Sequence, residues 1–359
     1  MYVQRIEALR KKNQLEGISA FLVSNFHNIL YLTGFETLTK DEREGFVFIT
    51  GKNAYVFTDA RYTYEGDAAI LKFLEPDRGL IVQLKEICTS ENIKSIGFEA
   101  EDITYQEYNL LSSLLSDTKF VPTKETVVRL REIKEKEEIN NIRIACELTD
   151  EVMREIIPFV VAGTTERELA IKLDSLIKVK RKEPSFDPIV AIDVQSAVPH
   201  YNSKNGHNKI TNASVILLDF GIAHNGYASD ITRMVFQKKA PTEAVSAYKK
   251  LLEVQTKTIE RVEHISELNL VDVFCREEIK TRELPDFSHS TGHGVGLEVH
   301  EYPKISFNSQ DKKTEGQVFT IEPGIYLEGK WGMRIEDTIL IENGQAKALT
   351  SFPKELLVL

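Results

Sequence analysis

An Asn-Gly pair at residues 225–226 lies between two apolar segments, residues 215–220 and 227–236. Asn and Gly both accept the left-handed backbone that a two-residue hairpin turn requires. Such a turn pairs its flanking segments antiparallel and fixes their register. With the turn at this position, His224 lies opposite Tyr227. The sequence therefore predicts a β-hairpin built from two strongly apolar strands.

Two aspartates share one face of this hairpin. The same register places Asp219 opposite Thr232, so Asp230 is a diagonal neighbour of Asp219. Diagonal neighbours have Cα atoms about 7–8 Å apart, which brings their carboxylates close together. Two carboxylates among apolar side chains repel each other and lose hydration. A metal ion, a shared proton or the nearby Arg233 would compensate; alternatively, one acid faces solvent at a strand end.

Three of the eight histidines lie within twelve residues, at positions 289, 293 and 300. Glycines at 292, 294 and 296 argue against a regular helix there and indicate closely packed backbone. The spacing differs from the His-Glu-x-x-His zinc motif, and the segment lacks the Lys-Ser/Thr of a phosphate-binding loop. A single histidine would favour a structural role, whereas the cluster favours a functional site.

Two glutamates occupy similar positions later in the chain. Glu322 lies at the end of the predicted strand that contains Phe319 and Ile321, and Glu336 follows Ile335 on the next predicted strand. Each glutamate alone would fit an exposed strand position. Together with the two aspartates and the histidine cluster, they form a ligand set suited to Mn²⁺, Co²⁺ or Zn²⁺. Shared carboxylates can also hold two ions, an arrangement that activates a hydroxide.

The chain is expected to form two domains, 1–122 and 123–359, with the boundary near Val121-Pro122. In the first domain, hydrophobic patterning predicts helices and strands at residues 4–15, 18–24, 45–59 (a hairpin), 94–98 and 104–115.

The charged segment from Leu130 onward predicts a linker that feeds a solvated helix. The apolar stripe of this helix would contain Ile133, Ile139, Ile142 and Cys146. Further along, Thr164 or Thr165 would cap the start of another helix.

Composition excludes several classes of protein. Lys and Arg number 45 against 55 Asp and Glu, a net charge of −10, which disfavours a nucleic-acid groove. No apolar stretch is long enough to span a membrane, so no membrane partner is expected. Three widely spaced cysteines exclude a disulfide scaffold, and the charged first residues lack the apolar core of a signal peptide. The expected location is the cytoplasm.

The five candidate ligands and their surroundings resemble the pita-bread metallopeptidases of the creatinase and prolidase type. The matching phrases are Asp219-Phe-Gly, Ser229-Asp230-Ile-Thr-Arg, Gly292-His293-Gly-Val-Gly, Ile321-Glu322-Pro-Gly and Arg334-Ile-Glu336-Asp. The first domain resembles the creatinase-type N-terminal domain through residues 28–35 and 58–62. The resemblance implies an α+β fold, with a C-terminal pita-bread domain preceded by a smaller α/β domain.

The resemblance also implies a role for each site residue. Asp219 would bind one metal ion through both oxygens, Asp230 and Glu336 would bridge two ions, and His293 and Glu322 would complete the second. His200, Glu322 and His300 would be catalytic, with Glu322 as the general base. His289, Tyr326 and Arg334 would lie on the substrate side or orient the ligands. Asp193 stands where relatives carry glycine, which puts the shape of the pocket rim in question.

The implied activity is hydrolysis of the bond between an N-terminal residue and proline, by an Xaa-Pro dipeptidase or, alternatively, an Xaa-Pro aminopeptidase acting on longer peptides. The cofactor would be two divalent ions, and the protein would be a homodimer. A peptide-binding module with an inactive metal site would have lost a ligand, and a metal-free C–N hydrolase would not need all five. Because metal binding requires a neutral imidazole, His293 with an ordinary pKa of about 6.5 would set the acid limit of activity.

Overall fold

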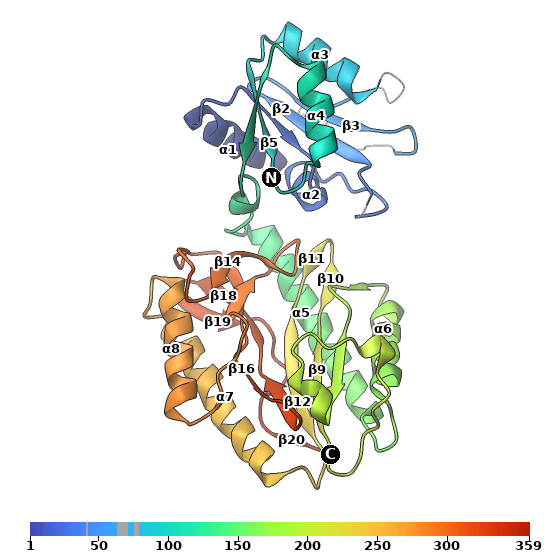
Figure 1. The fold of residues 1–359 in the computed structure, drawn as a ribbon, viewed down its shortest axis with the longest axis vertical. Helices are drawn as coiled ribbons and strands as arrows, with labels where there is room; N and C mark the ends of the chain where they lie inside the picture. Colours follow the sequence, from blue (N-terminus) through green and yellow to red (C-terminus); the bar gives the residue numbers. More distant parts are fainter. Residues whose placement is uncertain (41, 63–70, 75–78) are drawn as a thin grey trace. The chain divides into compact units, whose positions relative to one another are not determined.

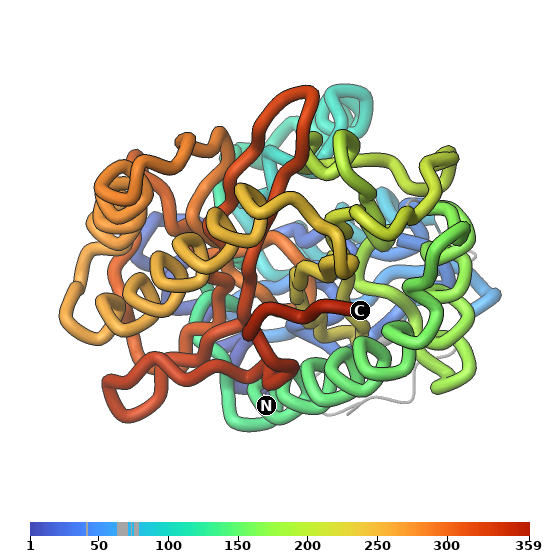
Figure 2. The backbone as a smooth tube through the Cα atoms, turned by 90° about the horizontal axis from the view of Figure 1, so that it is seen from below, coloured from blue at the N-terminus to red at the C-terminus, as the bar shows by residue number. Residues whose placement is uncertain are grey.

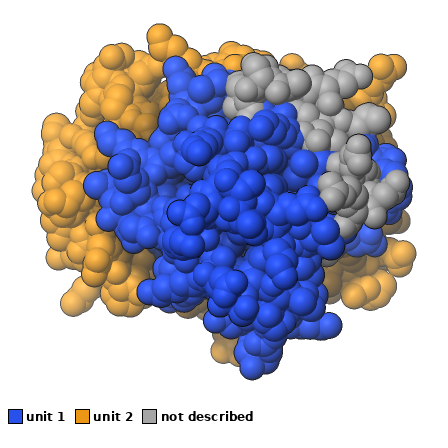
Figure 3. Space-filling model, turned by 90° about the horizontal axis from the view of Figure 1, so that it is seen from above, with its two compact units in different colours: residues 1–131 blue, residues 132–359 orange. Residues whose placement is uncertain are grey.

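The computed structural model describes residues 1–40, 42–62, 71–74 and 79–359. The chain divides into two compact units, residues 1–131 and 132–359, which are coloured separately in Figure 3. Among the described residues, no helix combines the length and hydropathy needed to cross a membrane. The three cysteines are buried and unpaired.

The first unit is a mixed sheet with helices packed against it (Figure 1). Its strands lie in the order β4-β3-β2-β1-β5-β6. The elements along the chain are α1 (Tyr2–Leu15), β1 (Ala20–Val23), α2 (Phe26–Thr33), β2 (Gly45–Thr50), β3 (Ala54–Thr58), β4 (Leu71–Phe73), α3 (Leu80–Ser90), β5 (Ser95–Glu99), α4 (Tyr105–Leu114) and β6 (Lys119–Thr123).

The predicted hairpin in this unit is confirmed, since β2 and β3 pair antiparallel with Gly45 opposite Thr58. Helix α2 was not among the predicted elements. The side chain of Asn25 accepts a hydrogen bond from the Asn28 N–H at the start of α2, and Gly34 ends the helix with φ 72°. Asn before a helix and Gly after it are the usual capping residues, so the signal was present in the sequence.

The division between the units lies after Arg131, later than the boundary expected at residues 122–123. Residues 119–123 form β6, which pairs with β5 at the edge of the first sheet. The next residues stay with this unit, because the Tyr31 hydroxyl donates to the Leu130 carbonyl and Arg131 Nη1 donates to Asn28 Oδ1.

The charged segment differs from the prediction at its start. The helix does not begin near Leu130: α5 runs from Lys136 to Ile156, and Ile133 lies before it with 50% exposure. The charges are also not all solvated, because Lys134 and Glu138 are buried. The helical pattern is defined by the spacing of apolar residues. It therefore cannot predict that a charged residue is buried by pairing with a residue far away in the sequence.

The second unit contains small, mainly antiparallel sheets enclosed by helices. Its helices are α5 (Lys136–Ile156), α6 (Glu166–Val179), α7 (Thr242–Val262) and α8 (Leu268–Thr281). Its strands are β7 (Glu183–Pro184), β8 (Ile189–Ile192), β9 (Val215–Phe220), β10 (Ile222–His224), β11 (Tyr227–Ala228), β12 (Ile231–Phe236), β13 (Gly292–Gly294), β14 (Glu301–Ile305), β15 (Val318–Ile321), β16 (Gly324–Leu327), β17 (Trp331–Arg334), β18 (Asp337–Glu342), β19 (Gln345–Ala348) and β20 (Leu357–Val358). The Thr165 side chain caps α6, as one of the two predicted alternatives.

Strand β9 lies between two apolar cores, with α5 and α6 on one side of the strands and α7 and α8 on the other (Figures 1 and 2). Ile216 and Leu218 belong to the core formed with α5 and α6, while Val215 and Leu217 belong to the core formed with α7 and α8. Successive side chains of a strand point to opposite faces, so burial on both faces explains the unbroken apolar run of β9.

Candidate active site

The predicted hairpin carries both aspartates into the interior of the second unit. His224 pairs with Tyr227, and Thr232 pairs with Asp219, so the predicted register is confirmed. Near the middle of the hairpin the strands approach closely: a Cβ on Gly221 would lie 1.8 Å from the Ser229 carbonyl oxygen. This contact directly precedes Asp230, and only glycine can occupy position 221 without moving it.

His293 and Glu322 come from a second sheet. His293 Nε2 lies 3.3 Å from Glu322 Oε1 and 3.7 Å from Asp230 Oδ2. The expected close packing at the glycines is present. A Cβ on Gly292 would lie 1.9 Å from the Thr320 carbonyl oxygen, and a Cβ on Gly294 would lie 2.1 Å from that of Tyr302. The strand that carries His293 is thus fixed closely between its neighbours.

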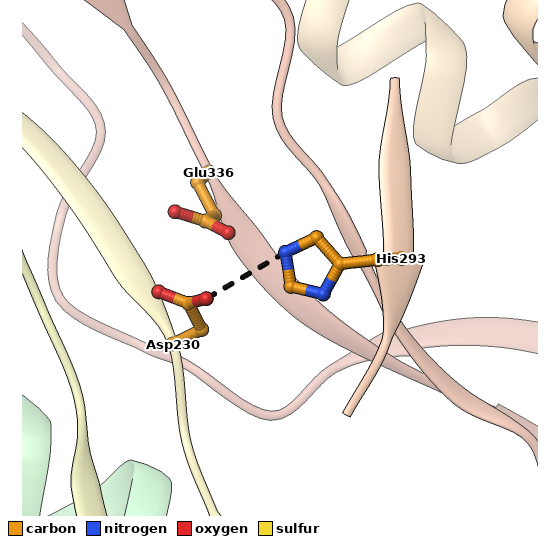
Figure 4. Close-up of side chains that lie close together, drawn as sticks. All are labelled: Asp230, His293 and Glu336. Carbon is orange, nitrogen blue, oxygen red and sulfur yellow. Dashed lines mark ion pairs between the residues drawn. The ribbon is translucent and has the colours of Figure 1, made fainter. Parts of the chain in front are cut away.

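Glu336 completes a group of three side chains that point toward one another in Figure 4. Asp230, His293 and Glu336 each offer one ligand atom, and these atoms lie within 4.8 Å of one another. The Glu336 N–H donates to the Thr232 carbonyl, and the Thr232 hydroxyl donates to Glu336 Oε2 at 2.6 Å. This geometry can hold a metal ion between two sheets.

Three buried carboxylate oxygens lack a hydrogen-bond partner among the described residues: Asp219 Oδ1, Asp230 Oδ1 and Glu336 Oε1. A buried oxygen without a donor has lost its hydrogen bonds to water and has gained none from the protein, which is energetically unfavourable. Three such oxygens beside one imidazole are the donor set that a divalent cation would satisfy. The residues therefore fit a metal centre.

Arg334 forms an ion pair with the Asp219 carboxylate. Arg334 Nη2 pairs with Asp219 Oδ2, and Nε donates to the Thr232 hydroxyl at 3.1 Å. Asp219 therefore has one oxygen paired with arginine and one oxygen without a donor. Its predicted use of both oxygens toward metal stays a prediction.

A hydrogen-bonded chain continues from Arg334 to His289. Arg334 Nη1 donates to the Tyr326 hydroxyl at 2.8 Å, and that hydroxyl lies 2.9 Å from His289 Nε2. Because His289 Nδ1 lies 2.8 Å from the Ser290 carbonyl, the proton belongs on Nδ1 and the Tyr326 hydroxyl donates to Nε2. Both ring nitrogens of His289 are engaged, and its contact with substrate stays a prediction.

Thr232 has a role that sequence reasoning missed. Its hydroxyl accepts from Arg334 and donates to Glu336, so it fixes the orientation of two charged side chains at once. The available signal was its position directly opposite Asp219 in the predicted hairpin. Loss of a group that orients metal ligands in this way typically weakens metal binding about 10- to 100-fold.

The two other histidines predicted to be catalytic, His200 and His300, are exposed. The His300 ring packs edge-on against His293, with ring centroids 4.3 Å apart. Desolvation, together with the nearby His293 and His200, lowers the pKa of His300 to about 4. His200 is exposed, and it lies close enough to Asp219 to influence the pKa of that carboxyl. The structure thus brings His200 and His300 to the same site as the carboxylates.

Asp193, in the turn before His200, adopts the left-handed backbone conformation with φ 54°. Its carboxylate accepts hydrogen bonds from the Ser214 hydroxyl and the Val215 N–H, both at 2.8 Å. Asp is one of the few residues that tolerate this conformation. The Asp193 side chain therefore links this turn to the start of β9.

Burial raises the pKa of Asp230 and of Glu336 well above their usual range, and the other carboxylates of the site add to the rise. Burial lowers the pKa of His293 to about 4. His293 therefore does not have the ordinary pKa of about 6.5 on which the predicted acid limit was based. His293 is neutral above about pH 4, whereas the raised pKa values of Asp230 and Glu336 mean that protons compete with metal for these carboxylates at higher pH than usual.

The metal-free protein should lose stability as the pH rises above about 4, the ordinary pKa of its carboxyl groups in the unfolded chain. Asp230 and Glu336 have folded-state pKa values above their unfolded values of about 4, so the folded chain binds more protons than the unfolded chain. The free energy of unfolding then falls as pH increases. Bound metal replaces those protons and should remove the decline. Thermal melts of chelator-treated and Mn²⁺-loaded protein would measure both trends, and parallel curves would contradict the metal centre.

Comparison with known proteins yields two family matches. Residues 140–343 match the metallopeptidase family M24, and residues 5–133 match the creatinase/prolidase N-terminal domain. An Xaa-Pro dipeptidase of Pyrococcus furiosus is 32% identical, over 99% of this chain and 99% of its own.

Solved structures agree in fold. The Xaa-Pro dipeptidase from Bacillus anthracis superimposes with a TM-score of 0.92 at 31% identity, covering 100% of both chains. An X-Pro aminopeptidase from Thermotoga maritima gives 0.85 at 31% identity, covering 97% of this chain and 100% of its own. The α+β architecture implied by the sequence motifs, a smaller first domain before a pita-bread domain, is confirmed.

Proposed function

This chain belongs to metallopeptidase family M24, and on that premise we propose that it uses two divalent metal ions to hydrolyse the bond between an N-terminal residue and proline. The observation that carries the proposal is the grouping of Asp230 and Glu336 with His293, together with three buried carboxylate oxygens that have no hydrogen-bond partner among the described residues. Relatives named for Xaa-Pro dipeptidase activity align over nearly the whole chain and support the substrate class.

Five side chains would hold the ions: Asp219, Asp230, His293, Glu322 and Glu336. Carboxylate and imidazole ligands suit Mn²⁺ or Co²⁺, with Zn²⁺ also compatible. When bound, such ions polarise a carbonyl and lower the pKa of a water. Arg334 and Thr232 would keep the carboxylates in place, because Arg334 pairs with Asp219 and the Thr232 hydroxyl donates to Glu336.

Glu322 is proposed as the general base. Its Oε1 faces His293 and accepts from the Thr320 hydroxyl at 3.3 Å, so its orientation is fixed. Burial raises the pKa of Glu322, which brings proton uptake closer to neutral pH, where a general base is most effective. Glu322 would take a proton from the water that attacks the scissile carbonyl, and this proton can pass to the proline nitrogen as the C–N bond breaks.

His300 and His200 are proposed to act on the substrate carbonyl. With a pKa of about 4, His300 is neutral at physiological pH and can donate an N–H to the developing oxyanion. A neutral donor keeps its proton at the oxyanion without adding a positive charge beside the metal ions. His200, which is also exposed, would assist.

Substrate length distinguishes the two named activities. We expect Ala-Pro to be hydrolysed at least as efficiently as Ala-Pro-Ala, and Ala-Ala poorly, with Mn²⁺ or Co²⁺ added. The measurement is kcat/KM for each peptide, with Asp230→Asn purified in parallel as the control for contaminating peptidases. A tripeptide preference above about 10-fold, or about 1.4 kcal/mol, would favour the alternative, an Xaa-Pro aminopeptidase. Equal cleavage of Ala-Ala would remove proline specificity.

The homodimer also belongs to this proposal. Light scattering of the purified protein would give the mass directly, and a single 40.8 kDa species would contradict it.

A further inference from the structure

A buried lysine ahead of helix α5 pairs with a glutamate next to the site. Lys134 Nζ lies 2.7 Å from Glu301 Oε1, and each of these side chains is 1% exposed. Glu301 directly follows His300 in the sequence. The backbone of Lys134 is itself held in place, because its backbone N–H donates to the Gly316 carbonyl. The preceding residue, Ile133, also forms a β-bridge with Gln317. The ion pair therefore joins two segments that are far apart in sequence.

The Glu301 carboxylate packs against the loop of residues 295–300, which connects β13 to β14. A Cβ on Gly296 would lie 2.2 Å from Glu301 Oε1, so the carboxylate fills the space that this glycine leaves. The Glu298 N–H points to Glu301 Oε2 at 3.4 Å. The position of the loop backbone thus depends on where the carboxylate is held.

The His300 ring has few constraints of its own. It is exposed, its ring contact is with His293, and no hydrogen bond holds it in the part of the chain that the structure describes. Its orientation must therefore come from the backbone, which is fixed at the adjacent Glu301.

We propose that the Lys134–Glu301 ion pair keeps the loop of residues 295–300 in place and thereby holds His300 in its catalytic position. The inference rests on the proposed function, in which His300 acts on the substrate. Lys134 is a positioning residue that does not touch the substrate. A buried carboxylate strongly disfavours losing its cation, so the pair holds the loop in one arrangement.

The first test is a double-mutant cycle. Lys134→Met should lower kcat about 10- to 100-fold with little change in KM, because the reacting group is displaced while binding is retained. In a His300→Ala background the same change should cost less than about twofold. Equal losses in both backgrounds would overturn the inference, as would wild-type kcat for Lys134→Met. Glu301→Gln serves as a second variant if Lys134→Met fails to fold, with the same expectations.

The second test does not depend on activity. Hydrogen–deuterium exchange of residues 295–300 should speed up in Lys134→Met, while exchange in α7 stays unchanged. Lys180→Met is the matched control, because it removes a lysine that pairs with Glu151 and Glu155 elsewhere on this unit. Unchanged exchange in the loop would overturn the inference. A wild-type protein without Xaa-Pro activity would instead contradict the proposed function, and the exchange result would still decide whether the ion pair holds the loop.

Discussion

Asp230→Asn should lower metal content and peptide hydrolysis together. Asparagine keeps the shape of the side chain but removes the charge and one ligand oxygen, in a group whose ligand atoms lie within 4.8 Å of one another. Loss of residues that only orient ligands weakens metal binding about 10- to 100-fold, so loss of a proposed ligand should cost at least about 100-fold. Elemental analysis and kcat/KM on Ala-Pro, measured on the same preparation, would test this.

In the metal-free protein, Asp230→Asn should instead increase the stability of the fold. Glu336 and Asp219 both raise the pKa of buried Asp230, which means that its charge is unfavourable when no cation is present. Removing that charge should raise the melting temperature of the chelated protein. Asp187→Asn is the control, because Asp187 is exposed and pairs only with the exposed Lys204 in the described structure. A fully active, metal-loaded Asp230→Asn enzyme would contradict the ligand assignment.

The hairpin shows how much local sequence can predict. Asn225 and Gly226 both adopt positive φ, at 50° and 81°, as a two-residue turn requires. This turn alone fixes the register, and the register places Asp219 and Asp230 on one face. The candidate site could therefore be assembled from patterns that extend over fewer than about ten residues each.

Features that depend on distant partners could not be predicted. The sequence predicts that the charged side chains of residues 131–138 face solvent. Lys134 is nevertheless buried, because it pairs with Glu301. In the same way, the lowered pKa of His293 arises from burial between two sheets, which no local pattern contains. Helix α2 is a different case, since its capping residues were visible but its eight residues are too few for a clear periodic pattern.

His300→Ala should keep the metal and lose turnover. His300 lies against the His293 ring and outside the group formed by Asp230, His293 and Glu336, so its removal leaves that group intact. A group that donates to the oxyanion or moves a proton contributes about 10²–10⁴-fold to kcat. We therefore expect a loss of that size in kcat at unchanged metal content, whereas His293→Ala should lose metal.

The pH dependence of kcat distinguishes a neutral His300 donor from a protonated one. Because the pKa of His300 is about 4, the wild-type kcat should show no step near pH 6.5 that disappears in His300→Ala. A step of that kind would mean that the histidine works as an imidazolium. His264→Ala, an exposed histidine at the end of α7, is the matched control and should behave as wild type. If His300→Ala and His293→Ala lose metal equally, His300 belongs with the ligands and its proposed role toward the carbonyl is wrong.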